Sequence, residues 1–315
     1  MEGFADRLID RALARRSRVV VGLDPDIGRF PAFLRAQLQQ QPTEAQLEEV
    51  VVAFNQLVIE ATEAEVVAYK PQAAFYEQYG LAGMRALQRT LTLLRERGLL
   101  VIMDAKRNDV AHTAGAYGIA WLAPRHPLFD AANPWQVDAL TLNGYLGSDG
   151  IVPFLEVNPE AGLFVLTKTS NPSSGELQDL FLWTEGGERG GTVAEKMAEL
   201  VHQWGQRGVG RHGFSNVGMV VGATYPEMAG QLRRLAPQAL FLMPGIGAQG
   251  GSLEGIVAGA GPQGVGAYAA SSRSLLYPFR PDELADAHWS DRARARILAA
   301  AQQLRQAIHA RLMAV

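Results

Sequence analysis

The fold is decided by the stretch Leu99-Leu100-Val101-Ile102-Met103-Asp104-Ala105-Lys106-Arg107-Asn108-Asp109. A short apolar run that ends in acidic and basic residues is typical of a buried parallel strand. Because side chains alternate along a strand, Asp104 and Lys106 should point the same way. Asp109 follows just past the strand, and we expect its carboxylate to meet the same ammonium group. A lysine between two carboxylates should stay protonated, so Lys106 is a candidate proton donor. For this motif alone, an ion-paired loop is the simpler interpretation.

Strand-like runs of this kind alternate with helical patterns along the chain. The expected strands are Arg18–Asp24, Val66–Lys70, Leu99–Asp104, Ala139–Asn143, Gly162–Lys168, Val217–Gly222, Ala239–Pro244 and Gly264–Ala270. The helical patterns include Thr43–Ala64, Met84–Arg97, Thr192–Gln206, Glu227–Leu235 and a C-terminal helix, Asp282–Met313. Eight strands with intervening helices predict an α/β fold, a (β/α)8 TIM barrel, rather than an open doubly wound sheet.

Two stretches look inserted into this barrel. Pro25–Gln41 follows the first strand, and Asn171–Gly191 follows the fifth. The second stretch is rich in turn residues, and we expect a long loop over the site. No boundary to a second domain is visible, so residues 1–315 are expected to form a single barrel domain.

Composition narrows the classes of function. The chain has 315 residues, 48% of them hydrophobic, a net charge of −3 and no cysteine. This charge gives no reason to expect a nucleic-acid partner, and no apolar stretch is long enough to span a membrane. The first 18 residues are charged and amphipathic, without the apolar core of a signal peptide. A soluble, cytoplasmic protein is the expectation.

Polar and glycine-rich residues follow the predicted strands, at the end where barrels of this type carry their sites. They include Asp24, Lys70, the Asp104–Lys106 pair and the run Lys168-Thr169-Ser170. The seventh strand runs into Pro244-Gly245-Ile246-Gly247-Ala248-Gln249-Gly250-Gly251, and the eighth precedes Arg273. A glycine-rich loop lets main-chain N–H groups approach an anion, and an arginine offers a charged fork. The last two strands therefore predict a phosphate site.

Two other motifs do not support a cofactor or a metal. Residues 245–250 match the G-x-G-x-x-G dinucleotide pattern, but the motif lies late in the chain. No acidic residue follows at the distance needed to hold a ribose. The six histidines are dispersed without the spacing of metal ligands.

Taken together, these motifs resemble a known family. Gly22-Leu23-Asp24, Lys70, the run from Asp104 to Asp109 with Thr113, and the loop 244–251 are similar to those of orotidine 5′-phosphate decarboxylases. The resemblance extends from the first strand to Arg273. The length and the second insertion resemble the larger bacterial subgroup. Asn108 stands where many members have glycine. This difference affects the local geometry of the loop and not the charged residues.

The resemblance implies a reaction and a set of catalytic residues. The reaction converts orotidine 5′-monophosphate to UMP and CO2 in pyrimidine biosynthesis, without metal or cofactor. Lys106 would stabilise the carbanion at C6 and protonate it, and Asp104 would orient Lys106 beside the substrate carboxylate. Lys70 would hold Asp104 and a ribose hydroxyl. Asp109 would complete a Lys-Asp-Lys-Asp array.

The same resemblance assigns substrate contacts and a partner. Asp24 would bind ribose hydroxyls, and Ser170, or Thr169 if the register shifts by one, would bind the pyrimidine amide. Gln249 and Arg273 would bind the phosphate. Asp109 and Thr113 would serve the neighbouring subunit of a homodimer with shared sites. Their four-residue spacing at a predicted helix start places both on one face.

Two other functions stay open at this point. A sugar-phosphate lyase on the same barrel would use Mg²⁺ and need a further carboxylate at the end of the second strand, where this chain has Lys70. A non-catalytic barrel that binds a phosphate or nucleotide belongs to another class. Retention of the charged strand-end residues argues against it, because unpaired buried charges are costly without a task.

Overall fold

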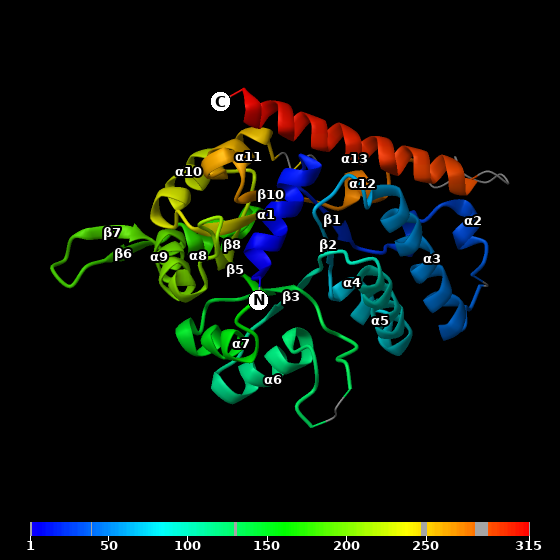
Figure 1. Ribbon diagram of the computed structural model, residues 1–315, viewed down its shortest axis with the longest axis horizontal. Helices are drawn as coiled ribbons and strands as arrows, with labels where there is room; N and C mark the ends of the chain where they lie inside the picture. The colour runs from blue at the N-terminus through cyan, green and yellow to red at the C-terminus, as the bar shows by residue number, and fades with distance from the viewer. Residues whose placement is uncertain (1, 39, 129–130, 247–250, 281–288, 315) are drawn as a thin grey trace.

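The computed structural model describes residues 2–38, 40–128, 131–246, 251–280 and 289–314. Eight parallel strands form one sheet in the order β2-β1-β10-β9-β8-β5-β4-β3. Isolated parallel bridges from Tyr69 to Val101 and from Gln72 to Asp104 join its two outer strands. The sheet therefore curls into a barrel with helices around it (Figure 1), which confirms the predicted TIM-barrel fold.

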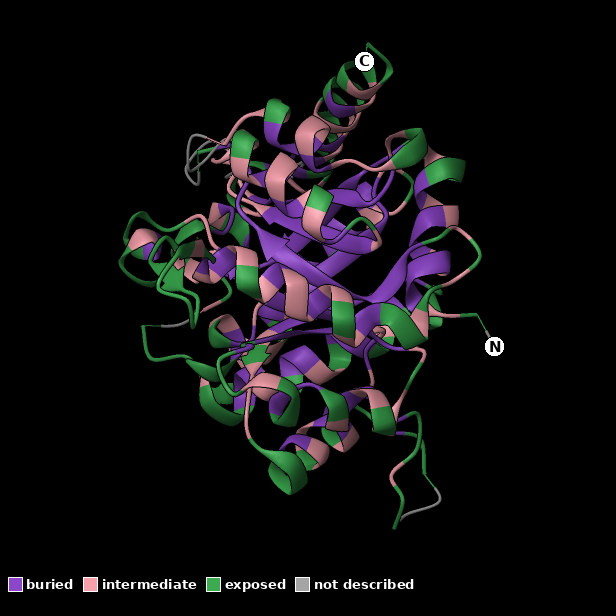
Figure 2. Cartoon of the chain, turned by 90° about the vertical axis from the view of Figure 1, so that its left-hand side faces the viewer, coloured by how far each residue is buried: buried purple, intermediate pink, exposed green. Residues whose placement is uncertain are grey.

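Each predicted strand is present, with ends shifted by a few residues. The barrel strands are β1 (Val19–Leu23), β2 (Ala68–Pro71), β3 (Ile102–Arg107), β4 (Ala139–Leu142), β5 (Gly162–Lys168), β8 (Ser215–Val221), β9 (Ala239–Pro244) and β10 (Ala267–Ser271). Most of their residues are buried, as Figure 2 shows for the centre of the molecule. Burial on both faces explains why the runs are continuously apolar instead of alternating.

The longer helices are α1 (Phe4–Arg15), α3 (Glu44–Thr62), α5 (Gly80–Glu96), α6 (Ala111–Leu122), α9 (Val193–Gly205), α10 (Pro226–Leu235) and α13 (Trp289–Met313). Shorter ones are α2 (Ala32–Arg35), α4 (Ala74–Glu77), α7 (Val152–Val157), α11 (Leu253–Gly259) and α12 (Arg273–Leu276). The N-cap residues of α3 and α9 are Thr43 and Thr192, and each forms a complete capping box. Within the described chain, no helix is long and apolar enough to cross a membrane.

Helix α1 covers the amino-terminal end of the barrel (Figure 1). Its buried apolar residues join the side chains that fill the barrel interior in one hydrophobic cluster. Phe4 packs edge-on against Phe164 of β5, with ring centres 5.9 Å apart. The amino end is thus closed by apolar contacts, and the carboxyl end is left to polar residues.

The predicted insertion after the fifth strand is present, but Asn171–Gly191 contains regular structure where we expected a long loop. The segment contains two short helices, η3 (Pro172–Ser174) and α8 (Gly175–Gln178), and then a strand, β6 (Phe181–Trp183). Strand β6 pairs with β7 (Arg189–Thr192) in an antiparallel hairpin that projects from the barrel beside α9 (Figure 1). The turn residues Glu185-Gly186-Gly187-Glu188 close this hairpin, so the turn-rich composition reflects a tight turn. The first insertion contains η1 (Ile27–Arg29) and α2.

Candidate active site

Three charged side chains form a continuous array at the carboxyl ends of β2 and β3. The Lys70 ammonium donates to Oδ2 of Asp104 at 2.7 Å, and that of Lys106 donates to Oδ1 at 2.6 Å. Asp104 and Lys106 thus point to the same side, as strand alternation requires. One carboxylate therefore holds two ammonium groups.

Two neutral residues that sequence reasoning missed complete the contacts of Asp104. The Gln72 amide donates to Oδ2 at 3.0 Å, and the Thr141 hydroxyl donates to Oδ1 at 3.0 Å. Gln72 lies two residues beyond Lys70, and Thr141 is a buried polar residue in the apolar run of β4. Thr141 carried a signal in the sequence, because a polar group inside a buried strand needs a partner, whereas the half-buried Gln72 beyond β2 carried none.

Burial and charge act in opposite directions on this array. Burial would raise the pKa of Asp104, but the ammonium groups of Lys70 and Lys106 outweigh it and hold the pKa well below its usual range. Burial would likewise lower the pKa of Lys70, and the carboxylates of Asp104 and Asp24 reverse this and raise it. Both groups are therefore ionised at neutral pH. The Lys70 side chain is 8% exposed and that of Lys106 is 44% exposed, so Lys106 is the cation that a substrate can reach.

The main chain at Lys106 is unusual. Its φ of 48° lies in the left-handed region, which costs energy for a residue with a side chain. The pairing of β3 with β4 also shifts register between Met103 and Arg107. The Lys106 N–H, displaced from a regular ladder, donates instead to the Thr141 hydroxyl at 3.0 Å. Thr141 therefore positions both the main chain of Lys106 and the carboxylate of Asp104.

A cavity of about 390 Å³ lies beside the array, and Lys70 and Gln72 form part of its wall. Asp24, Ser170 and Arg273 also line it. Oδ1 of Asp24 is buried without a hydrogen-bond partner among the described residues. A buried carboxylate oxygen without a donor is costly, which is expected where a ligand supplies the donor.

The far wall of this cavity depends on close packing between β1 and α12. A Cβ atom at Gly22 would lie 1.9 Å from the Ser272 hydroxyl oxygen, so only glycine fits there. The Tyr277 hydroxyl donates to the Asp24 carbonyl and accepts from the Asp26 N–H. These contacts bring Arg273 to the same cavity as Asp24.

Ser170 and Thr169, the two residues after β5 that were candidates for the pyrimidine contact, lie in different surroundings. The Thr169 hydroxyl donates to Oδ1 of Asn171 at 2.6 Å and contacts the Gln178 amide, whereas Ser170 lines the cavity. Gln249 lies outside the described residues. Among those residues, no cluster of three or more histidine or acidic side chains is suited to hold a metal ion.

The expectation that Asp109 meets the Lys106 ammonium is wrong for the single chain. Oδ1 of Asp109 instead accepts the N–H of Val110 at 2.8 Å. Asp109 also precedes α6, whose N-cap is Val110, so the expected helix face with Thr113 does not begin at Asp109. Asp109 is half-buried and Thr113 exposed. The pairing of β3 is irregular just before Asp109, so the regular strand geometry behind this expectation does not extend to it.

Fold and site together define a (β/α)8-barrel enzyme with an ion-paired Lys-Asp-Lys array at the carboxyl ends of its strands. The model of the orotidine 5′-phosphate decarboxylase / HUMPS family matches residues 17–275. The chain belongs to this family.

Individual relatives agree with the family match. The orotidine 5′-phosphate decarboxylase of Rhodopirellula baltica is 39% identical over 97% of this chain and all of its own length. The solved Leishmania donovani OMP decarboxylase is 33% identical with a TM-score of 0.73, covering 99% of this chain and 100% of that one. Leishmania donovani UMP synthase is 35% identical with the same TM-score, and this chain spans 56% of its length.

Proposed function

We propose that this protein decarboxylates orotidine 5′-monophosphate to UMP and CO2, a step of pyrimidine biosynthesis. The observation that carries the proposal is the buried Asp104 carboxylate between Lys70 and Lys106, at the functional end of a barrel of this family. Fixed charges of this kind suit a reaction whose transition state concentrates charge on one atom.

The proposed reaction breaks the bond between C6 of the pyrimidine and its carboxylate carbon. The electron pair stays on C6, in an orbital that the ring cannot delocalise, and CO2 leaves. Lys106 stabilises this carbanion and donates its proton to C6, and the neutral amine then regains a proton from solvent. Asp104 orients Lys106. Its negative charge also repels the substrate carboxylate in the ground state, and this repulsion ends when the carboxylate leaves as neutral CO2.

Lys70 has a different task in this proposal. It is almost fully buried and bound to Asp104, so it holds that carboxylate in place and reaches toward a ribose hydroxyl. Asp24 accepts ribose hydroxyl hydrogen bonds at its unpartnered oxygen. Ser170 contacts the pyrimidine amide, and Arg273, together with Gln249, binds the phosphate.

We further propose that a homodimer shares its sites, with Asp109 and Thr113 completing the site of the neighbouring subunit. Three exposed apolar residues, Val110, Tyr145 and Leu146, support this arrangement. Tyr145 and Leu146 precede η2 (Gly147–Gly150), which packs against the main chain of Asp109. Apolar groups exposed beside a carboxylate that does not reach its own array are expected at an interface between copies.

Two broader expectations accompany this function. A single eight-stranded sheet with one helical layer supports the proposal that residues 1–315 form one domain. A charged nucleotide substrate does not cross a lipid bilayer unaided, which supports a cytoplasmic location.

The decisive experiment follows the loss of substrate absorbance with purified protein in EDTA, without any added cofactor. Decay to UMP that disappears in Lys106→Ala, while UMP still binds that variant, is the expected result. Lys196→Ala removes an exposed lysine from α9 and serves as the matched control, which should keep wild-type turnover.

Two other results would refute the proposal. Turnover of a sugar phosphate that requires Mg²⁺ would indicate the lyase function, although the buried Lys70 ammonium would repel a cation beside Asp104. Binding of UMP without turnover in either assay would indicate a non-catalytic barrel.

A further inference from the structure

A second cavity, of about 650 Å³, lies at the opposite, amino-terminal end of the barrel. One wall is the face of α1 that carries Arg7, Arg11 and Arg15 at four-residue spacing. The other walls are the connection from α5 to β3 and the residues before β4, including Leu99 and Asp138. None of the described residues that line it belongs to the candidate active site.

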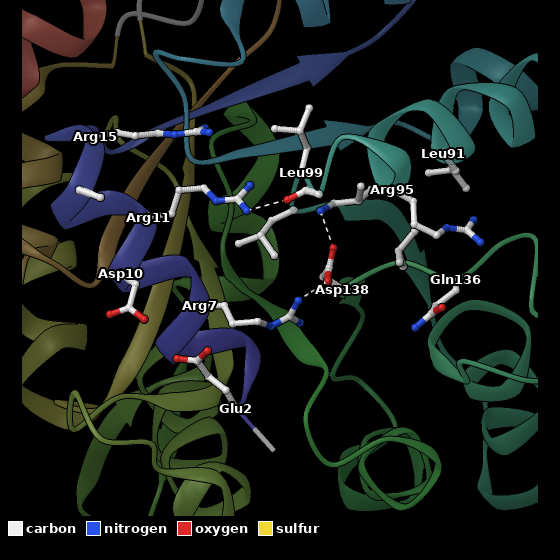
Figure 3. Close-up of a pocket in the computed structure, with 15 residues that line it drawn as sticks. Glu2, Arg7, Asp10, Arg11, Arg15, Leu91, Arg95, Leu99, Gln136 and Asp138 are labelled. Carbon is white, nitrogen blue, oxygen red and sulfur yellow. Dashed lines mark hydrogen bonds and ion pairs between the residues drawn. The ribbon is translucent and has the colours of Figure 1, made fainter.

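The arginine side chains on α1 extend in the same direction across this cavity, as Figure 3 shows. Arg7 is neutralised, because it pairs with Oδ1 of Asp138 at 2.6 Å. Arg11 donates to the Gly98 carbonyl at 2.7 Å, and Arg15 donates to the Val66 carbonyl. A carbonyl oxygen orients a guanidinium group without cancelling its charge. Arg11 and Arg15 therefore have no carboxylate partner among the described residues.

The acidic residues that line the cavity are engaged elsewhere. Asp138 accepts from the Val101 N–H at 2.9 Å in addition to its pair with Arg7. Asp10 binds Arg211 and His212, and Glu2 also binds Arg211. On the far wall, Arg95 donates to two main-chain carbonyls, those of Asn133 and Pro134. The cavity thus carries an excess of positive charge.

Two further features of Arg11 favour an anionic ligand in this cavity. Its Nη1 atom is buried without a hydrogen-bond partner among the described residues. Burial, and then the positive charge of Arg15, lower the pKa of Arg11, and the nearby Asp138 carboxylate offsets this only in part. An anion bound in the cavity beside these side chains would offset the repulsion between Arg11 and Arg15.

The chemistry of the walls defines the class of ligand. Paired guanidinium groups match phosphate oxygens, and the carbonyl contacts already hold them in place. The apolar part of the lining comes from Ala14, Leu91, Leu99 and Val137, of which the last three are at most 6% exposed. The volume falls within the roughly 300–1,000 Å³ typical of small-molecule sites.

We propose that this cavity binds a nucleotide, with its phosphates on Arg11 and Arg15 and its base on the apolar wall. The site is separate from the proposed decarboxylase site, and the proposal does not depend on that activity.

The test is a calorimetric titration of the full chain with ATP and with inorganic triphosphate, both in EDTA. We expect ATP to bind more tightly than triphosphate, because only ATP can use the apolar wall. Arg11→Gln and Arg15→Gln should each weaken binding of both probes about tenfold, the loss of one charge-assisted contact. Arg16→Gln removes an exposed arginine outside the cavity and should change the dissociation constant less than twofold.

Hydrogen exchange of the wild-type chain locates the bound probe without any variant. Protection by ATP should fall on residues 4–15 and 94–101, and thermal melts should show that the variants fold. Protection confined to residues 22–24 and 271–277 would overturn the proposal, because the probe would then occupy the candidate active site. Equal binding of ATP and triphosphate, an equal loss in Arg16→Gln, or no binding at millimolar ATP would also overturn it.

Discussion

At the scale of single residues, the site depends on how one buried carboxylate is held. Asp104 accepts hydrogen bonds from two ammonium groups, an amide and a hydroxyl. This number of donors explains why a buried carboxylate stays ionised. The neutral donors matter because they fix the position of Asp104 without competing for the charge of Lys106.

Thr141→Val should lower kcat by about 10- to 100-fold with little change in KM, since a hydrogen bond to a charged group contributes about 1.5–3 kcal/mol. The variant keeps the shape of the side chain but frees the Lys106 N–H and one oxygen of Asp104. Steady-state kinetics on orotidine 5′-monophosphate would measure the effect. Thr167→Val is the matched control, because its hydroxyl contacts only the Val165 carbonyl among the described residues. An equal loss in both variants would contradict a positioning role for Thr141.

The array also predicts how stability depends on pH. The pKa of Asp104 is held below its ordinary value of 3.8, so its contribution to stability is present above that value and lost as pH falls below it. The free-energy advantage of wild type over Asp104→Asn should therefore shrink between about pH 5 and pH 2. Urea unfolding of both chains across this range would measure it. A constant advantage would show that Asp104 does not draw stability from its charge.

At the scale of elements, an ion pair between the buried Lys168 and the half-exposed Asp179 fixes the insertion after β5. The Lys168 ammonium, on a side chain 2% exposed, donates to both carboxylate oxygens of Asp179 at 2.7 and 2.8 Å. It also donates to the Ser174 hydroxyl and lies 4.7 Å from the centre of the Tyr225 ring. This cluster anchors η3 and α8 to the strand end that carries Ser170.

Asp179→Asn should lower the free energy of unfolding by about 1–2 kcal/mol, because it leaves the buried Lys168 without a charged partner, an effect that solvent at the half-exposed Asp179 reduces. Glu199→Gln breaks an exposed pair with Lys196 on α9 and should cost less than about 1 kcal/mol. Urea unfolding of the two variants gives the comparison. If the Lys196 pair cost as much as the Lys168 pair, the anchoring role of Lys168 would be refuted.

At the scale of the whole molecule, the two ends of the barrel have different tasks. Helix α1 closes the barrel interior at the amino end with apolar contacts and carries the arginines of the proposed nucleotide cavity, whereas the carboxyl end holds the Lys-Asp-Lys array. The proposed dimer extends this division, since Asp109 lies at the functional end but does not meet its own Lys106.

Mixing Asp109→Ala chains with Lys106→Ala chains tests the shared site. Each heterodimer would contain one intact site, so a statistical mixture should recover about a quarter of wild-type activity from two nearly inactive parents. Activity measured after the subunits are mixed and re-associated gives the result. Absence of recovery despite heterodimers detected by native mass spectrometry would show that Asp109 serves its own chain.

The sequence alone determined the fold and much of the candidate site. Eight buried apolar runs separated by helical patterns specify a barrel, because parallel strands covered on both faces must be apolar throughout. Strand alternation placed Asp104 and Lys106 on one side, and strand-end position selected Lys70, Asp24, Ser170 and Arg273. Strand alternation and strand-end position depend only on neighbouring residues, so a single sequence is enough to predict them.

Tertiary structure decided what depends on contacts between distant segments. The contacts of Gln72 and Thr141 with Asp104 join separate segments, and Asp109 accepts the Val110 N–H instead of meeting Lys106. The hairpin of β6 and β7 forms where composition predicted a loop. The uncompensated charge of Arg11 and Arg15 also emerged only in the folded chain. A periodic pattern shows which face of a segment is buried, but the partner of each polar group is set by how the segments pack.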